Sequence, residues 1–183
     1  MSQALKLLIN RSQAEQIVSD PEVLIWLLPM ERDRVTQILY RVMDKVGMVV
    51  LPFNIAPLKH CLLEGDLVQM GVRKYSNEEW ELGFAPGITQ VIPERGIEAI
   101  LAHELGHIAA PPDLAGMEAE KWADIFTARH GYGPDLASVL ELTEALYTEE
   151  GNLSGFVVPD TVHPDNTNRA QWLTGERVRS DRA

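Results

Sequence analysis

The chain has 183 residues, of which 45% are hydrophobic and 23% are charged, and its formal net charge is -11 at pH 7. This composition fits one globular domain, residues 1–183, with a single core. The negative charge opposes binding to nucleic acid or anionic lipid, because both attract a positive surface. The longest apolar run near the start, 23–30, falls far short of the ~20 residues that span a bilayer. We therefore expect neither a nucleic-acid nor a membrane partner.

Cysteine usage and the start of the chain indicate a cytoplasmic protein. Cys61 is the only cysteine, so no disulfide can form within the chain. The first eleven residues contain an apolar patch that Lys6 interrupts, which is too short for the core of a signal peptide. We give Cys61 no role in a functional site.

Residues 1–47 are expected to form a helical layer. Asp20-Pro21 is a helix start, and a short helix follows it. Apolar residues then recur every three or four positions and predict a second helix that ends at Gly47. These apolar positions are Val35, Ile38, Leu39, Val42 and Val46.

Residues 48–92 are expected to form a small sheet. Short runs of β-branched and other apolar residues alternate here with Pro, Gly, Asn and Asp, which is the pattern of strands joined by turns. The runs cover 48–51, 67–72, 80–84 and 88–92.

Residues 93–183 are expected to be mainly helical, and Pro111-Pro112 ends the first helix. Gly131 suits the left-handed position that closes the second. With the sheet before them, these helices predict an α+β fold that is mainly helical. After a turn at 93–96, the predicted helices cover 97–110, 113–130, 134–147 and 166–173, with loop between the last two.

The first of these helices carries the pattern H-E-x-x-H, as His103-Glu104-Leu105-Gly106-His107. Two histidines four positions apart lie on one face of a helix, where both imidazoles can reach one metal ion. Zinc accepts neutral imidazole at about 2.0–2.1 Å. Glu104 is turned by about 100° from His103, so it can instead reach a water at the metal as a general base. The helix is otherwise rich in Ile and Leu, and a metal explains buried imidazoles better than solvent does.

A catalytic zinc usually has three protein ligands, so a third must come from elsewhere in the chain. Glu120 is one candidate, on the second predicted helix. Asp124 lies one turn later on the same face and could receive the free N–H of either histidine. The small residues Gly106 and Ala123 would let the two helices approach closely.

Asp113, six positions after His107, is the alternative third ligand. A ligand at that spacing needs a tight bend directly after the helix. Ala110 stands where such a bend carries glycine, and Pro111-Pro112 stiffens the chain. The pattern therefore favours His103, His107 and Glu120 as ligands of Zn²⁺.

At these residues the sequence resembles the gluzincin metallopeptidase family that includes the HtpX heat-shock protease and the CAAX prenyl endopeptidase. Residues 103–107 match the family's H-E-x-x-H, and residues 120–124 match its E-x-x-A-D. His163-Pro164 with Arg169 matches a third element, and residues 84–88 look like the F-A-x-P-G turn that leads into an edge strand. The similarity covers roughly 82–173.

The resemblance implies a zincin-like domain in which an edge strand flanks the H-E-x-x-H helix. A protein or peptide substrate would be aligned by β-addition along that strand, at 88–91. The resemblance assigns His163 either to stabilising the oxyanion or to a fourth bond to zinc, and Arg169 to holding the loop of His163. His60 and His130 receive no catalytic role.

The predicted function is hydrolysis of peptide bonds by a zinc metallopeptidase. His103, His107 and Glu120 would bind the metal, and Glu104 and His163 would be the catalytic residues. The alternative is a non-catalytic interaction or regulatory protein that retains the same fold and is stabilised by zinc. A peptidase assay distinguishes the two.

Overall fold

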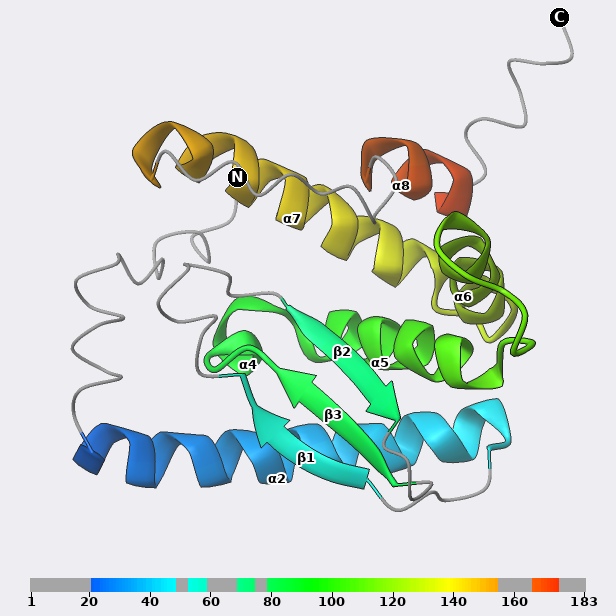
Figure 1. The fold of residues 1–183 in the computed structure, drawn as a ribbon. Coiled ribbons are helices and arrows are strands. Elements are labelled where there is room, and N and C mark those ends of the chain that lie inside the picture. The colour runs from blue at the N-terminus through cyan, green and yellow to red at the C-terminus, as the bar shows by residue number, and fades with distance from the viewer. Residues whose placement is uncertain (1–20, 49–52, 59–68, 75–78, 155–165, 175–183) are drawn as a thin grey trace, which may run out of the picture. The chain divides into compact units, whose positions relative to one another are not determined.

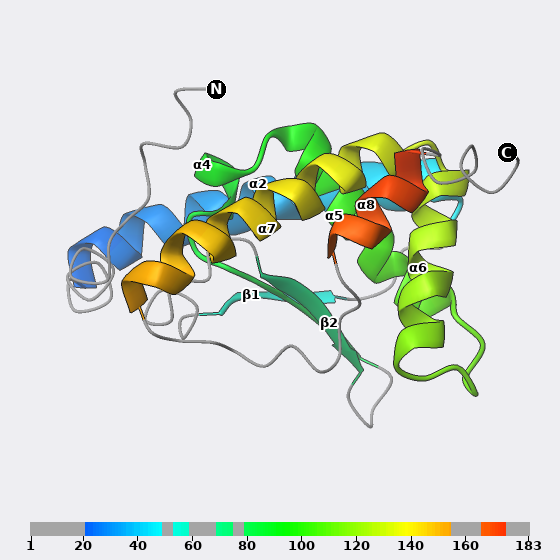
Figure 2. The same ribbon diagram turned by 90° about the horizontal axis from the view of Figure 1, so that it is seen from above.

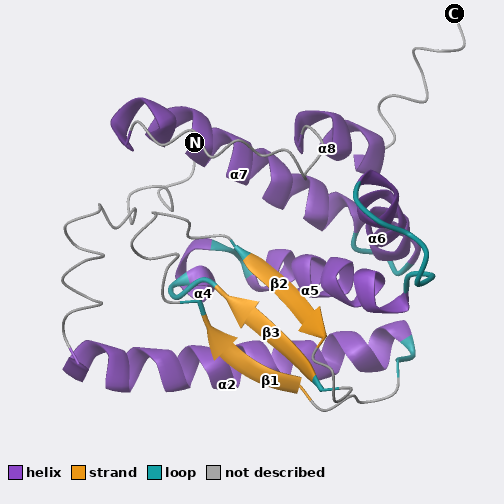
Figure 3. Cartoon of the chain, in the orientation of Figure 1, coloured by secondary structure: helices purple, strands orange, loops and turns teal. Residues whose placement is uncertain are grey.

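A computed structural model describes residues 21–48, 53–58, 69–74, 79–154 and 166–174 (Figure 1). The chain divides between Ile97 and Glu98 into two compact units, and each is described by itself. The described residues form helices and one small sheet, which confirms the predicted α+β class (Figure 3). The prediction of one domain over 1–183 stays a prediction.

The first unit begins with the helix α2 (Pro21–Val46). Two helices were expected over this range, but α2 is continuous, with Pro29 inside it. The predicted end is confirmed, since Gly47 follows the helix with a φ of 70°. The apolar stripe faces the core, because five of its residues are almost fully buried: Val35, Ile38, Leu39, Val42 and Met43.

The sheet of this unit has the strand order β1-β3-β2. Its strands are β1 (Phe53–Pro57), β2 (Met70–Lys74) and β3 (Trp80–Phe84). The central strand β3 pairs in parallel with β1 and antiparallel with β2. The side chains of Leu82 and Phe84 on β3 are fully buried. The helix α2 packs against β1 and supplies part of the core beneath the sheet (Figure 1).

The structure confirms some of the predicted strands and not others. The run at 80–84 coincides with β3. The run at 67–72 overlaps β2, which begins at Met70. Of the run at 48–51, only Met48 is described, and it lies in a loop. The strand β1 was not predicted, because its sequence Phe-Asn-Ile-Ala-Pro has a polar residue and a proline among few apolar ones.

The predicted strand at 88–92 is wrong, because residues 88–91 form the short helix α4 (Ile88–Val91). Gly87, with a φ of 90°, turns the chain into α4. Its N–H donates a hydrogen bond of 2.8 Å to Glu31, and the hydroxyl of Thr89 donates another of 2.8 Å to the same carboxylate. Ile88 and Ile92, four positions apart, are both buried. The two hydrogen bonds to Glu31, which lies far away in the sequence, and the burial of two isoleucines at helical spacing therefore override the β propensity of this run.

The helix α5 (Glu94–Ala109) carries the H-E-x-x-H pattern and continues into the second unit. It begins three residues earlier than predicted, since the carbonyl of Pro93 accepts the N–H of Ile97. The segment 94–96, expected to be a turn, is its first turn. The helix ends just before Pro111-Pro112, close to the expected position.

The second unit continues with α6 (Met117–Arg129), α7 (Gly133–Ser154) and α8 (Asn166–Thr174). The helix α6 begins four residues later than predicted, after Gly116 with a φ of 54°. Gly131, with a φ of 80°, closes it as predicted. The helix α7 packs against both α6 and α8. The helices α7 and α8 lie side by side in both views (Figure 1 and Figure 2).

Some predictions fall on residues that the structure does not describe. His60, Cys61 and His163 are among these, so their predicted roles stay predictions. Within the described ranges, none of the helices combines the length and the apolar character that crossing a bilayer requires.

Candidate metal site

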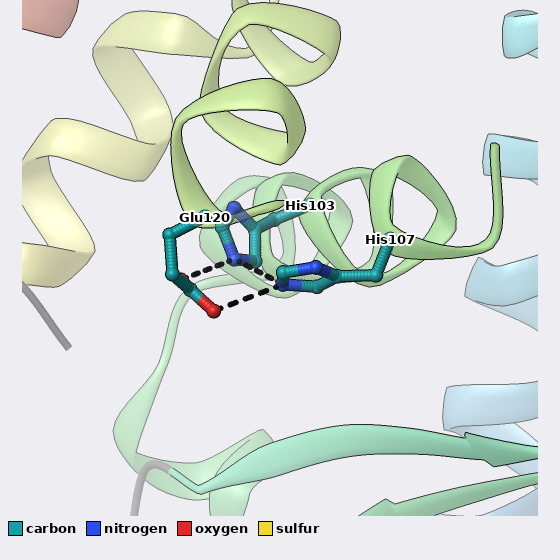
Figure 4. A group of neighbouring side chains, drawn as sticks. All are labelled: His103, His107 and Glu120. Carbon is teal, nitrogen blue, oxygen red and sulfur yellow. Dashed lines mark hydrogen bonds and ion pairs between the residues drawn. The ribbon is translucent and has the colours of Figure 1, made fainter. Parts of the chain in front are cut away.

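Two helices of the second unit bring three side chains together. His103 and His107 lie one turn apart on α5, so both imidazoles leave the same face of the helix. Glu120 lies in the first turn of α6. Figure 4 shows its carboxylate facing the two rings. Among the described residues, these three form the one group of His, Cys, Asp and Glu side chains that could hold a metal ion.

The two helices can approach this closely because their contact residues are small. A Cβ atom added to Gly106 would lie 2.8 Å from the Cα of Ala123. Gly106 lies between the two histidines in sequence, and Ala123 lies one turn after Glu120. The predicted role of this pair is confirmed: the backbone contact places the carboxylate of α6 beside the imidazoles of α5.

The two imidazoles lie close to each other, and each faces a different oxygen of Glu120. The Nε2 atoms of His103 and His107 are 3.1 Å apart. Oε2 of Glu120 lies 3.3 Å from Nε2 of His103, and Oε1 lies 3.3 Å from Nε2 of His107. A tetrahedral zinc ion with bonds of 2.0–2.1 Å requires donors separated by about 3.3–3.4 Å. The three side chains therefore bring potential ligand atoms to separations close to those in a zinc tetrahedron, and these atoms all lie within 4.8 Å of one another.

The three donors differ in their exposure to solvent. The side chains of His103 and Glu120 are each 8% exposed, whereas that of His107 is 23% exposed. Solvent therefore reaches the group from the side of His107. Access of solvent is a requirement of a catalytic metal site, which keeps one position for water or substrate.

Asp124 on α6 contacts the far nitrogen of His103. Its Oδ1 lies 3.0 Å from Nδ1, although the N–H bond points off the line between the two atoms. The sequence left open which histidine Asp124 would serve, and the structure selects His103. A proton on Nδ1 facing this carboxylate leaves the lone pair of Nε2 directed at the metal position.

Arg169 on α8 makes a two-point contact with Asp124. Its Nε donates to Oδ2 at 2.9 Å, and its Nη2 donates to Oδ1 at 2.7 Å. Nη2 also lies 3.5 Å from Oε2 of Glu120. The resemblance assigned Arg169 to the loop of His163, and sequence reasoning missed its contact with Asp124. The two residues are 45 positions apart, and no periodicity links them.

The charges at the site favour a cation. Burial alone would lower the pKa of His103, but the carboxylates of Asp124, Glu120 and Glu104 raise this pKa to about 9. Burial likewise opposes the charge of Asp124, yet His103 and Arg169 hold the pKa of Asp124 below its usual value. The carboxylates therefore favour a positive charge at His103, whether it comes from a proton or from a metal ion.

The side chains around His103 combine several charges in a buried place. Glu104, Glu120 and Asp124 are carboxylates, Arg169 carries one positive charge, and the raised pKa of His103 favours a second. The side chains of Glu104, Glu120, Asp124 and Arg169 are nearly buried, at 9% exposure or less. A cation bound here would face these buried carboxylates.

Glu104 lies next to His103 on α5 and is 9% exposed. Its charge acts on its neighbours, since it contributes to raising the pKa values of both His103 and Arg169. Glu104 does not belong to the group of three possible ligands. The predicted role of Glu104 as a general base stays a prediction.

The other candidates lie apart from this group. Asp113, the alternative third ligand, is exposed in the segment between α5 and α6 and does not join the three donors. His130 lies at the end of α6, where its Nδ1 is 2.8 Å from the carbonyl of Phe126.

Comparisons of the chain with known protein families, with curated proteins and with solved structures found no match.

Proposed function

We propose that this chain is a zinc-dependent metallopeptidase that hydrolyses peptide bonds. The observation that carries the proposal is the cluster of His103, His107 and Glu120, in which the two Nε2 atoms are 3.1 Å apart and each lies 3.3 Å from one oxygen of Glu120. Two imidazole nitrogens and a carboxylate are a common ligand set of catalytic zinc. The H-E-x-x-H pattern and its resemblance to gluzincins support the same function.

The donor chemistry supports zinc as the metal. Imidazole nitrogen suits Zn²⁺ better than it suits Mg²⁺ or Ca²⁺, which prefer oxygen ligands. Asp124 supports the tautomer of His103 that zinc requires, with the proton on Nδ1. The buried carboxylates of Glu104, Glu120 and Asp124 favour a cation at these donors.

Bound at these donors, zinc would polarise the substrate carbonyl and lower the pKa of the attacking water. Proton transfer and access of the substrate would depend on side chains of the protein. Glu104 would take a proton from the attacking water and transfer it to the leaving amine. The partly exposed side of His107 would admit the substrate.

The resemblance also implies an oxyanion donor. His163 stays the predicted residue for this role, or for a fourth bond to the metal. Alignment of the substrate by the backbone of 88–91 is not proposed, because these residues are helical and offer no strand edge.

The proposal is tested by measuring metal content and peptidase activity on the same sample. We expect about one zinc per chain by elemental analysis, and cleavage of an unstructured protein such as casein. A chelator should abolish the cleavage, and added zinc should restore it. Zinc without cleavage would favour the alternative, a zinc-stabilised interaction or regulatory protein, and the absence of zinc from a sample refolded with it would exclude both.

A further inference from the structure

Arg169 reaches the metal site without offering it a ligand. Its guanidinium contacts both oxygens of Asp124, at 2.9 Å through Nε and 2.7 Å through Nη2. Arg169 and Asp124 are only 9% and 3% exposed. A two-point contact of this kind fixes the plane of a carboxylate as well as its position.

One oxygen of Asp124 serves two neighbours. Oδ1 accepts the hydrogen bond from Nη2 of Arg169, and it also lies 3.0 Å from Nδ1 of His103. The carboxylate can face both groups only within a narrow range of its own rotation. The guanidinium selects that rotation, so it determines where the acceptor for His103 lies.

We propose that Arg169 is a positioning residue for the metal site and that it acts on His103 through Asp124. This inference rests on the proposed metal site. The direct distance from Nη2 of Arg169 to Oε2 of Glu120 is 3.5 Å, beyond the range of a strong hydrogen bond. The main influence of Arg169 therefore passes through Asp124, and α8 becomes part of the metal site although it holds no ligand.

A purely structural role makes a different prediction. If Arg169 only attached α8 to its neighbours, the loss of its side chain would destabilise the fold but leave the zinc affinity of the folded chain unchanged. If it positions Asp124, the effects of changing the two residues on metal affinity should not add. A double-mutant cycle read out by zinc affinity separates these possibilities.

Zinc affinity would be measured on the full chain by competition with a coloured chelator. Asp124→Asn and Arg169→Met should each weaken zinc binding about 10- to 100-fold. The double variant should bind zinc no more weakly than Asp124→Asn alone. Additive losses would overturn the inference. Arg129→Met, which changes an exposed arginine at the end of α6, should bind zinc like the unaltered chain.

Two further measurements separate position from charge. Arg169→Lys keeps the charge but cannot donate in parallel to both carboxylate oxygens, so its zinc affinity should stay close to that of Arg169→Met. Guanidinium ion, added at concentrations too low to unfold the chain, should restore zinc affinity to Arg169→Ala, whereas ammonium ion should not. Full affinity in Arg169→Lys, or no rescue of a variant that circular dichroism shows to be folded, would overturn the inference.

The affinity measurement also separates this inference from the proposed function. If the unaltered chain binds no zinc, both fail. If it binds zinc and Arg169→Met binds zinc equally tightly, the metal site stands and the positioning role of Arg169 is wrong.

Discussion

Gly106 and Ala123 touch so closely that a methyl group on Gly106 would stand 2.8 Å from the Cα of Ala123 and 3.2 Å from its carbonyl oxygen. Backbone atoms cannot move aside as the end of a flexible side chain can. The contact therefore leaves no room for any residue other than glycine on α5, unless α6 moves and takes Glu120 with it.

Gly106→Ala should destabilise the fold and weaken zinc binding together. Alanine normally favours a helix over glycine by up to about 1 kcal/mol, but overpacking typically costs roughly 1–3 kcal/mol and should outweigh that gain at this contact. Urea unfolding and zinc titration would measure the two effects. Gly71→Ala is the control, because a methyl group there meets nothing within 4 Å. A Gly106→Ala variant with unchanged stability and zinc affinity would contradict the close contact.

Glu104→Gln should retain the fold and the zinc but lose turnover. Its amide can still hydrogen-bond water, but it cannot accept a proton, and general base catalysis contributes about 10²–10⁴-fold to rates. The measurement is kcat for casein or a peptide beside the zinc content of the same sample. Glu141→Gln, an exposed change on α7, is the control. Near-normal turnover in Glu104→Gln would remove Glu104 from the mechanism.

Glu120→Ala and Asp113→Ala form a matched pair for the third ligand. The first should lose bound zinc and the rise in Tm that zinc gives the unaltered chain, because a ligand that binds the folded state stabilises it. The second should change neither quantity, since Asp113 is exposed and lies outside the donor group. The opposite result would move the third ligand to the segment after α5.

Glu31→Gln should destabilise the first unit. The carboxylate accepts the N–H of Gly87 on one oxygen and the hydroxyl of Thr89 on the other, both at 2.8 Å. An amide has one acceptor oxygen, so one buried donor loses its partner, at a cost of about 1–3 kcal/mol. Urea unfolding would measure the loss, with the exposed Asp33→Asn on the same helix as control. Equal stabilities of the two variants would show that the contact with Gly87 and Thr89 does not hold α4.

Glu94 should titrate differently once Arg41 is removed. A hydrogen bond from Arg41, its charge and the more distant Arg34 hold the pKa of Glu94 below its usual 4.5. A pKa lowered by folding stabilises the fold above pH 4.5, and this contribution disappears as the pH falls through the lowered value. NMR titration should show the pKa rising towards 4.5 in Arg41→Met and rising less in Arg34→Met. The reverse order would contradict the pairing.

The sequence was most informative where the structure is local. Helical spacing placed His103 and His107 on one face, and the same spacing placed Glu120 and Asp124 one turn apart on α6. The choice of Glu120 over Asp113 depended on short-range features, the two prolines and the missing glycine. Small residues at 106 and 123 predicted the close approach that the structure contains.

The predictions failed where a distant contact decides the local structure. The run at 88–92 has β-branched residues, but it begins with a helical turn whose Gly87 N–H and Thr89 hydroxyl donate to Glu31, 56 positions before Gly87. The partner of Arg169 was missed for the same reason, since Asp124 lies 45 positions away. Opposite charges occur throughout the chain, and their pairing follows from the packing of helices rather than from their spacing in the sequence.

The two imidazoles and one carboxylate at this site have a practical consequence for handling the protein. Sites with such donors also bind other divalent ions of the first transition series, and copper(II) binds more tightly than zinc. The metal in a sample purified on immobilised nickel should therefore be identified by elemental analysis before any ion is assigned to the site. Cobalt(II), loaded into the stripped protein, would serve as a coloured probe, since its visible absorption reports whether three side chains and one solvent position surround it as a tetrahedron.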